Sequence, residues 1–252
     1  MTDAKFEGLL RLGDTALVLS QRLAAWCGKG PALEEDMALA NVALDLLGQA
    51  RLWLSYAGEV EGKGRDEDQL AYLRDSREFR NLLLVEQSDH RNYAATLVRQ
   101  FYFDAWHHLA LRELQRSTDE RIAAIAEKAA KEVAYHLHRS GDLVIRLGDG
   151  TDQSHALVQQ AADSLWTFTG EMFVRDAVDD ALIAEKVSFD PATLKEPWLA
   201  CVREVFAAAT LRVPPAEAYM QDGGRQGRHT EQLGYLLAEM QVLQRAHPGA
   251  RW

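Results

Sequence analysis

Apolar residues recur at helical spacing along most of this chain, and the pattern is clearest between Ser117 and Leu147. Steps of four and three residues join one stripe there, which comprises Ile122, Ala126, Ala129, Val133, His136, Ser140, Leu143 and Leu147. Such a stripe is the buried face of an amphipathic helix. Ser117 and Glu120 have capping-box spacing, and Gly148 can end the helix. A helix of about thirty residues, or about 45 Å, is typical of a helical bundle.

Similar patterns occur on both sides of this stretch. They predict helices over residues 5–28, 33–57, 66–75, from Asp89 or Asn92 to about Arg116, 153–174, 191–210, and 231–246 with Thr230 as its cap. The first of these is apolar on two faces, so we expect neighbours on both sides of it. In the second, we expect the inward face to hold Met37, Ala40, Leu44, Leu47 and Leu54.

The connecting segments contain no repeat of fixed period and no domain linker. Residues 76–89 read as irregular, the acidic segment 176–186 as a connection, and 213–226 as the longest loop. With 252 residues and only 6 prolines, the chain can bury a core without disulfides. We therefore predict a single all-α domain over residues 1–252.

The overall charge and the cysteines narrow the function classes. The formal net charge is −10, which disfavours nucleic acid and anionic membranes as partners. The first residues lack the apolar core of a signal peptide, and no apolar run has the length needed to span a bilayer. Cys27 and Cys201 show no metal-binding spacing. We expect a cytoplasmic protein in which both thiols are reduced and buried.

Polar residues interrupt the inward stripes of four long helices at mid-height. They are Asp14 or Gln21, Asp45 with Gln49, Asp104 with His107, and His136. One buried polar residue is usually a satisfied core group, but one from each of four helices suggests a shared cluster. Three interpretations remain open, of which we favour the first: a hydrogen-bonded network, a working metal site, or no cluster.

The number of possible ligands disfavours the metal site. A bundle that binds two metals takes a carboxylate from each of two helices and Glu-x-x-His from each of two others. No glutamate in this chain is followed at the third position by histidine. The related Asp-x-x-His occurs at Asp104–His107 and at Asp152–His155, where the second pair lies in a predicted turn and is expected to be solvated. We therefore predict no metal, no cofactor and no catalytic residue in this chain.

Other candidate chemistry has a simpler structural explanation. The chain has no Gly-x-Gly-x-x-Gly, P-loop, Gly-x-Ser-x-Gly or Cys-x-x-Cys motif. His229 invites a catalytic interpretation, but its position beside Thr230 fits a helix cap better. Arg51 and Arg74 could bind phosphate, although isolated arginines on helices are usually solvated. Tryptophans at helical spacing are expected in the core, and they are Trp26, Trp53, Trp106, Trp166 and Trp198.

Several stretches resemble a known family. They are Arg11-Leu-Gly-Asp-Thr-Ala-Leu-Val-Leu-Ser-Gln-Arg-Leu, Leu44-Asp-Leu-Leu-Gly-Gln-Ala-Arg, Asn81-Leu-Leu-Leu-Val-Glu-Gln, His229-Thr-Glu-Gln-Leu-Gly-Tyr-Leu-Leu-Ala-Glu-Met-Gln-Val-Leu-Gln-Arg and Pro248-Gly-Ala-Arg-Trp. With these, essentially the whole chain resembles the phenylacetic acid degradation proteins of the PaaC type. These are C subunits of ring 1,2-phenylacetyl-CoA epoxidases, which are monooxygenase complexes.

The resemblance implies a ferritin-like bundle with additional C-terminal helices and a structural, non-catalytic role in phenylacetate degradation. It implies a hetero-oligomer with a homologous catalytic subunit that holds two irons. Accessory and reductase subunits belong to the same complex, and the reductase supplies electrons through flavin, iron–sulfur and NADPH. In isolation, a face built for a homologous partner could pair with its own copy, giving a homodimer. The alternatives are a diiron-type oxidase in its own right and an unrelated helical binding module.

The resemblance also assigns individual positions. Leu46 and Gln49 stand where the catalytic relative has Glu and His. Val133 stands at a Glu position, whereas His136 and Asp104 keep a histidine and a carboxylate. The resulting degenerate site comprises Asp14, Asp45, Gln49, Asp104, His107 and His136.

Overall fold

A computed structural model describes residues 2–88, 92–215 and 217–250, which contain helices and no β-strand. The chain divides into two compact units. Unit 1 holds Met1–Ser88 with Gly223–Trp252, and unit 2 holds Asp89–Asp222. Each is described by itself below, and the expectation of one domain over residues 1–252 stays a prediction. Among the described helices, none has the combined length and apolarity needed to cross a bilayer.

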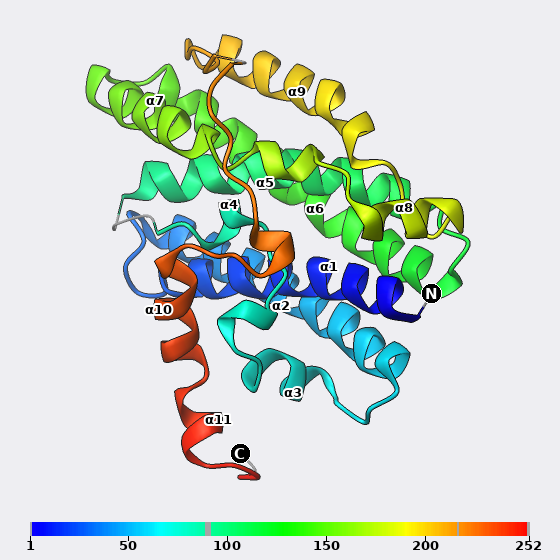
Figure 1. Ribbon diagram of the computed structural model, residues 1–252. Helices are drawn as coiled ribbons and strands as arrows, with labels where there is room; N and C mark the ends of the chain where they lie inside the picture. The colour runs from blue at the N-terminus through cyan, green and yellow to red at the C-terminus, as the bar shows by residue number, and fades with distance from the viewer. Residues whose placement is uncertain (1, 89–91, 216, 251–252) are drawn as a thin grey trace. The chain divides into compact units, whose positions relative to one another are not determined.

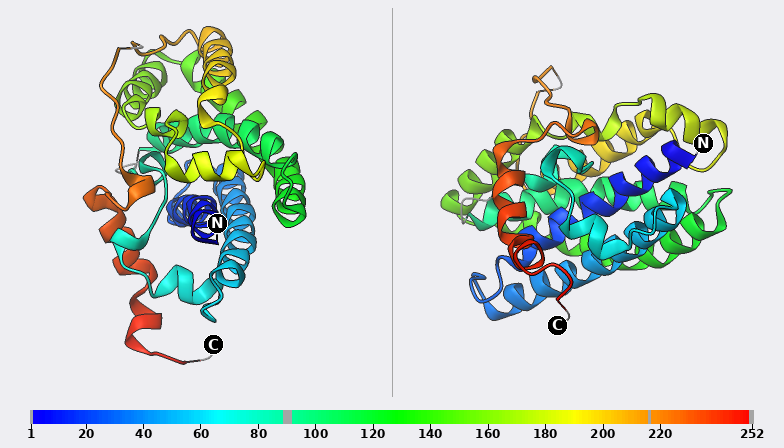
Figure 2. Two further views of the ribbon diagram at one scale, coloured as in Figure 1. Left: turned by 45° about the vertical axis from the view of Figure 1, so that its right-hand side comes forward. Right: turned by 60° about the horizontal axis from the view of Figure 1, so that its bottom comes forward.

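Unit 1 is built on an antiparallel pair of long helices, α1 and α2 (Figure 1). Figure 2 (left) looks nearly along α1, with α2 beside it. Shorter elements complete the unit, with α4 and α10 packed on α1 and α3 on α2. The elements are α1 (Thr2–Ala24), α2 (Leu33–Glu61), α3 (Glu67–Tyr72), η1 (Ser76–Glu78), α4 (Leu83–Glu86), η4 (Gly224–Gln226), α10 (Glu231–Met240) and α11 (Val242–Ala246).

Helix α1 has neighbours on more than one side, as its two apolar faces predicted. Every residue from Gly13 to Ser20 is buried. The irregular segment predicted at 76–89 contains the two short helical elements η1 and α4. Two backbone N–H groups of this stretch donate to side chains of α1, from Arg80 to Asp14 and from Leu82 to Thr15.

The predicted inward face of α2 is largely wrong. Met37, Leu44 and Leu47 are 58%, 65% and 39% exposed. The residues turned to the core instead include Val42 and Leu46. Helix α2 carries apolar residues on both of these faces, so periodicity alone could not choose the face that packs against α1.

Unit 2 is centred on α5, against which α6, α7 and α9 all pack. Its elements are α5 (Tyr93–Leu114), α6 (Glu120–Gly148), α7 (Asp152–Trp166), η2 (Gly170–Phe173), α8 (Ala177–Ala184), η3 (Pro191–Leu194) and α9 (Lys195–Ala208) (Figure 1). An aromatic cluster joins α5, α7 and α9. In it, the Tyr102 ring lies 5.8 Å from Trp166 and 5.6 Å from Trp198, and the Trp198 Nε1–H donates to the Tyr102 carbonyl at 2.9 Å.

Helix α6 confirms the organising stripe but begins differently from the prediction. The six stripe residues from Ile122 to Ser140 are buried. Toward the C-terminal end, burial moves from the predicted Leu143 to Val144, because 3.6 residues per turn drift away from a 3.5-residue pattern. The cap is Asp119, whose side chain accepts from two backbone N–H groups. The predicted Ser117 instead donates to the Val187 carbonyl at 2.7 Å.

Other boundaries also differ from the sequence-based prediction. Asn92 caps α5 through its side chain, while Asp89 lies outside the described residues. The acidic segment 176–186 contains a helix, α8, and is not only a connection. The last predicted helix is divided at Gln241, whose side-chain amide donates to the Ala71 and Arg74 carbonyls, both at 3.0 Å.

The burial predicted for the tryptophans is confirmed, whereas the burial predicted for the cysteines is not. All five of the predicted core tryptophans are buried. Both predicted buried thiols are wrong, since Cys27 is exposed in the turn after α1 and Cys201 is half-buried on α9. Partial burial raises the pKa of the Cys201 thiol.

Candidate functional site

Asp14 lies on the buried face of α1, and both of its carboxylate oxygens are bonded within unit 1. Its two carboxylate oxygens accept hydrogen bonds from both terminal nitrogens of Arg74 and from the Arg80 backbone N–H at 2.8 Å. Both side chains of the pair are buried. The Arg74 guanidinium also lies 4.5 Å from the centroid of the Phe79 ring. The prediction that Arg74 is solvated is therefore wrong, and Asp14 is a partner in a structural ion pair.

A second buried carboxylate, Glu86, connects two distant stretches of unit 1. Its Oε2 accepts from the Asn81 Nδ2 at 2.9 Å and lies 2.8 Å from the His229 Nδ1. Its Oε1 accepts from the Thr230 N–H at 2.7 Å and from the Thr230 hydroxyl at 2.8 Å. Thr230 is the residue before α10, as predicted, but its side chain bonds to Glu86 and not to the helix. The network thereby fixes the start of α10.

Both ring nitrogens of His229 lie within hydrogen-bond distance of a partner from another segment of unit 1. Nδ1 lies 2.8 Å from the Glu86 carboxylate, and Nε2 lies 3.0 Å from the Phe79 carbonyl. His229 therefore joins the segment before α10 to the stretch that contains Phe79 and Glu86.

In unit 2, Asp104 of α5 lies in a buried polar cluster with α6. Its Oδ1 accepts from the Gln100 Nε2 at 2.6 Å, and its Oδ2 accepts from the Ser140 hydroxyl at 2.8 Å. Burial raises the pKa of Asp104 to about 6, although the nearby His136 and the two hydrogen bonds act to lower it. His136 is buried on α6, and its charge acts on Asp104.

His107 stands in the same unit, in apolar surroundings. Its ring centroid lies 4.7 Å from that of Phe103, and its buried Nδ1 has no hydrogen-bond partner. Burial lowers the pKa of His107 to about 3, and the charges of His136 and His108 lower it further. His107 is consequently neutral at physiological pH, and it belongs to the cluster only through its nearness to His136.

The remaining predicted positions lie mostly in unit 1. Gln49 is buried on α2, and Asp45 is half-exposed. Leu46 of α2 is fully buried, as is Val133 of α6 in unit 2. Within residues 2–88, 92–215 and 217–250, no group of three or more His, Cys, Asp or Glu side chains has a geometry that could hold a metal ion.

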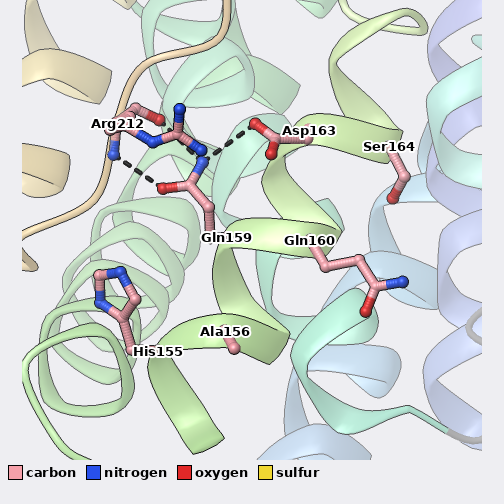
Figure 3. Close-up of a pocket in the computed structure, with 7 residues that line it drawn as sticks. All are labelled: His155, Ala156, Gln159, Gln160, Asp163, Ser164 and Arg212. Atoms are coloured by element: carbon pink, nitrogen blue, oxygen red, sulfur yellow. Dashed lines mark hydrogen bonds between the residues drawn. The ribbon is translucent and has the colours of Figure 1, made fainter. Parts of the chain in front are cut away.

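An open pocket of about 680 Å³ lies along α7 in unit 2 (Figure 3). Three of the residues that line it are hydrogen-bonded to one another. Gln159 donates to the Asp163 carboxylate at 3.0 Å and accepts from the Arg212 backbone N–H at 2.8 Å. His155, which was predicted to be solvated, is half-buried and places its Nδ1 2.8 Å from the Gly148 carbonyl, at the end of α6. These contacts hold α7 to its neighbours.

Sequence reasoning missed Glu86 and Gln100 as members of the two clusters. Glu86 fell in the segment predicted as irregular, and Gln100 lies one turn before Asp104 on α5. The signal for Glu86 was present, because it and His229 stand in two of the stretches that carry the family resemblance. Arg51 was predicted correctly as a solvated residue, since it is exposed and pairs with Glu67 at 3.1 Å.

Comparisons with known proteins cover nearly the whole chain. The family model described as phenylacetic acid catabolic protein matches residues 1–252. A curated relative is 54% identical over 246 residues, which are 96% of this chain and 97% of the relative. That relative is the C subunit of the 1,2-phenylacetyl-CoA epoxidase of Escherichia coli (strain K12).

Proposed function

The chain belongs to the family of phenylacetic acid catabolic proteins, and from this premise we propose that it is the C subunit of a 1,2-phenylacetyl-CoA epoxidase. The observation that carries the proposal is the identity of 54% over 96% of the chain with a relative of that name. The helical, ferritin-like fold expected from the resemblance agrees with it. Its role is in phenylacetate degradation, as one component of an oxidoreductase complex.

Within that complex, the role we propose for this chain is structural. Three positions support this. Leu46 and Val133 are buried hydrocarbon side chains where the resemblance places metal-binding glutamates in the catalytic relative. Asp14 has both carboxylate oxygens bonded to Arg74, so ligation by Asp14 would leave a buried guanidinium unpaired.

The Asp104 cluster supports the same proposal. Asp104 is buried on α5. Two neutral hydrogen-bond donors, Gln100 and Ser140, take both of its oxygens. Asp104 is satisfied as a member of a polar network.

The chemistry of the complex then resides in its partners. We propose that a homologous catalytic subunit holds the diiron centre. A reductase delivers electrons from NADPH through flavin and iron–sulfur groups, and an accessory subunit belongs to the same cytoplasmic complex. This chain contributes packing surface that holds and orients the catalytic partner.

Reconstitution tests this proposal. The chain is co-expressed with the diiron subunit of an epoxidase, and the mixture is separated by size-exclusion chromatography. We expect one larger species, and epoxidation of phenylacetyl-CoA only when both chains, the reductase and NADPH are present. Two independently eluting peaks would refute the assembly. Epoxidation by this chain with the reductase alone would show that it is an oxidase in its own right.

A further inference from the structure

Two opposite charges line the pocket along α7 in unit 2, Asp163 of α7 and Arg212 in the segment after α9. Both residues are exposed. Within residues 2–88, 92–215 and 217–250, neither side chain forms an ion pair, whether with the other or with a third residue. Charged surface side chains are normally solvated, so the two charges mark a binding site only if the fold positions them.

A buried amide, the side chain of Gln159, positions both residues. Only 8% of Gln159 is exposed, and its Nε2 donates to the Asp163 Oδ1 at 3.0 Å and to the Arg212 carbonyl at 3.1 Å. Its Oε1 accepts from the Arg212 backbone N–H at 2.8 Å, and Figure 3 shows Gln159 between the two charged residues. The carboxylate and the base of the arginine are thus each one hydrogen bond away from the same nitrogen atom.

The segment that presents Arg212 contains a strained residue. Thr210 ends α9 with φ at +56°, a conformation that glycine adopts without strain and a β-branched residue rarely adopts. Its Oγ1 lies 3.4 Å from the Nδ1 of His155, which lines the pocket. Strained backbone persists where the surroundings fix it, and it is concentrated at ligand-binding sites. The strain beside the pocket therefore favours a binding site over an ordinary surface.

The two charges select a class of ligand. Within the described part of the chain, the second oxygen of Asp163, Oδ2, accepts no hydrogen bond, and it can take an ammonium group. The Arg212 guanidinium has the planar fork of donors that matches a carboxylate. The net charge of −10 disfavours polyanions such as nucleotides. A ligand that carries one ammonium and one carboxylate satisfies both residues without adding net charge.

We propose that the α7 pocket binds a free amino acid with a polar, uncharged side chain. Its carboxylate pairs with Arg212 and its ammonium with Asp163, while Gln160 and Ser164 on the same wall bond its side chain. Exposed ion pairs contribute little, so the complex is weak, with a dissociation constant on the order of 1 mM. The proposal does not depend on the epoxidase role.

Saturation-transfer NMR titration of the full chain with L-glutamine tests the ligand class. We expect saturable binding of L-glutamine. N-acetyl-L-glutamine, which lacks the ammonium charge, and L-glutamine methyl ester, which lacks the carboxylate, should each bind about fivefold more weakly. No saturable binding of L-glutamine would overturn the proposal. Equal binding of the two derivatives, or tighter binding of adenosine monophosphate, would do the same.

Variants test the assignment of each charge. Asp163→Asn should weaken L-glutamine about fivefold and leave N-acetyl-L-glutamine unaffected, because only the free ammonium meets this carboxylate. Arg212→Gln should weaken L-glutamine and leave the methyl ester unaffected. The matched controls are Asp152→Asn on α7 and Arg203→Gln on α9, which change exposed charges outside the pocket lining and should leave binding intact. Equal losses for a ligand and its derivative would show that the substituted charge does not contact the ligand.

Discussion

Replacing His107 by leucine should make the protein less sensitive to acid. The folded-state pKa of His107 is about 3, compared with 6.5 for an unperturbed histidine. The unfolded chain therefore binds a proton at His107 more readily than the folded chain does. The stability contributed by the neutral ring is fully present above pH 6.5 and is lost as the pH falls toward 3.

The size of the effect follows from the two pKa values. Each pH unit within this window removes about 1.4 kcal/mol, so the wild type should lose roughly 3 kcal/mol through His107 between about pH 7 and pH 4.5. His107→Leu removes that loss. At neutral pH the variant should be at least as stable as the wild type, because it removes a buried nitrogen that has no hydrogen-bond partner. The contribution of Asp104 is common to both proteins and cancels in the difference.

Urea denaturation followed by circular dichroism at about pH 7 and pH 4.5 measures both free energies of unfolding. The control is His138→Gln, which changes an exposed histidine on α6 and should leave the pH dependence of the wild type unaltered. If the stability of His107→Leu falls with pH in parallel with the wild type, the desolvation of His107 is not the cause of acid sensitivity.

Three further outcomes are expected. Arg74→Met leaves the buried Asp14 carboxylate unpaired and should cost roughly 3–5 kcal/mol in urea denaturation, whereas changing both residues to apolar ones should recover part of the loss. Burial raises the pKa of Asp104 from 3.8 to about 6, so the stabilisation from its protonated form is fully present below pH 3.8 and is lost as the pH rises through 6. Asp104→Asn should remove roughly 3 kcal/mol of this change in unfolding free energy with pH, and a variant with the pH profile of the wild type would contradict the prediction. Elemental analysis of the chain purified with excess iron should find far less than one iron per chain, while about two would contradict the structural role.

Local periodicity determined much of unit 2. Helix α6 has one apolar stripe and a polar remainder, so only one face could be turned to the core, and the stripe from Ile122 to Ser140 was predicted residue by residue. The same reasoning placed Asp104 and His136 on inward faces, and both are buried. Where a helix has a single apolar face, the sequence alone specifies which side is buried.

Helix α2 shows where that reasoning ends. Its two apolar faces satisfy the same periodicity, and the choice between them depends on which one complements α1. The core took the face with Val42 and Leu46, leaving Met37 and Leu44 exposed. Only packing against another element could decide this, because both faces contain similar apolar residues.

The charged partners were also decided by tertiary structure. Asp14 and Arg74 are 60 residues apart, and Glu86 and His229 are 143 apart. No local pattern relates such residues, because a side chain's periodicity reports which face of its own helix it occupies. Which charge it meets depends on the segment that the fold brings to that face. The sequence alone therefore identified Asp14 as buried, whereas its pairing with Arg74 could be seen only in the folded chain.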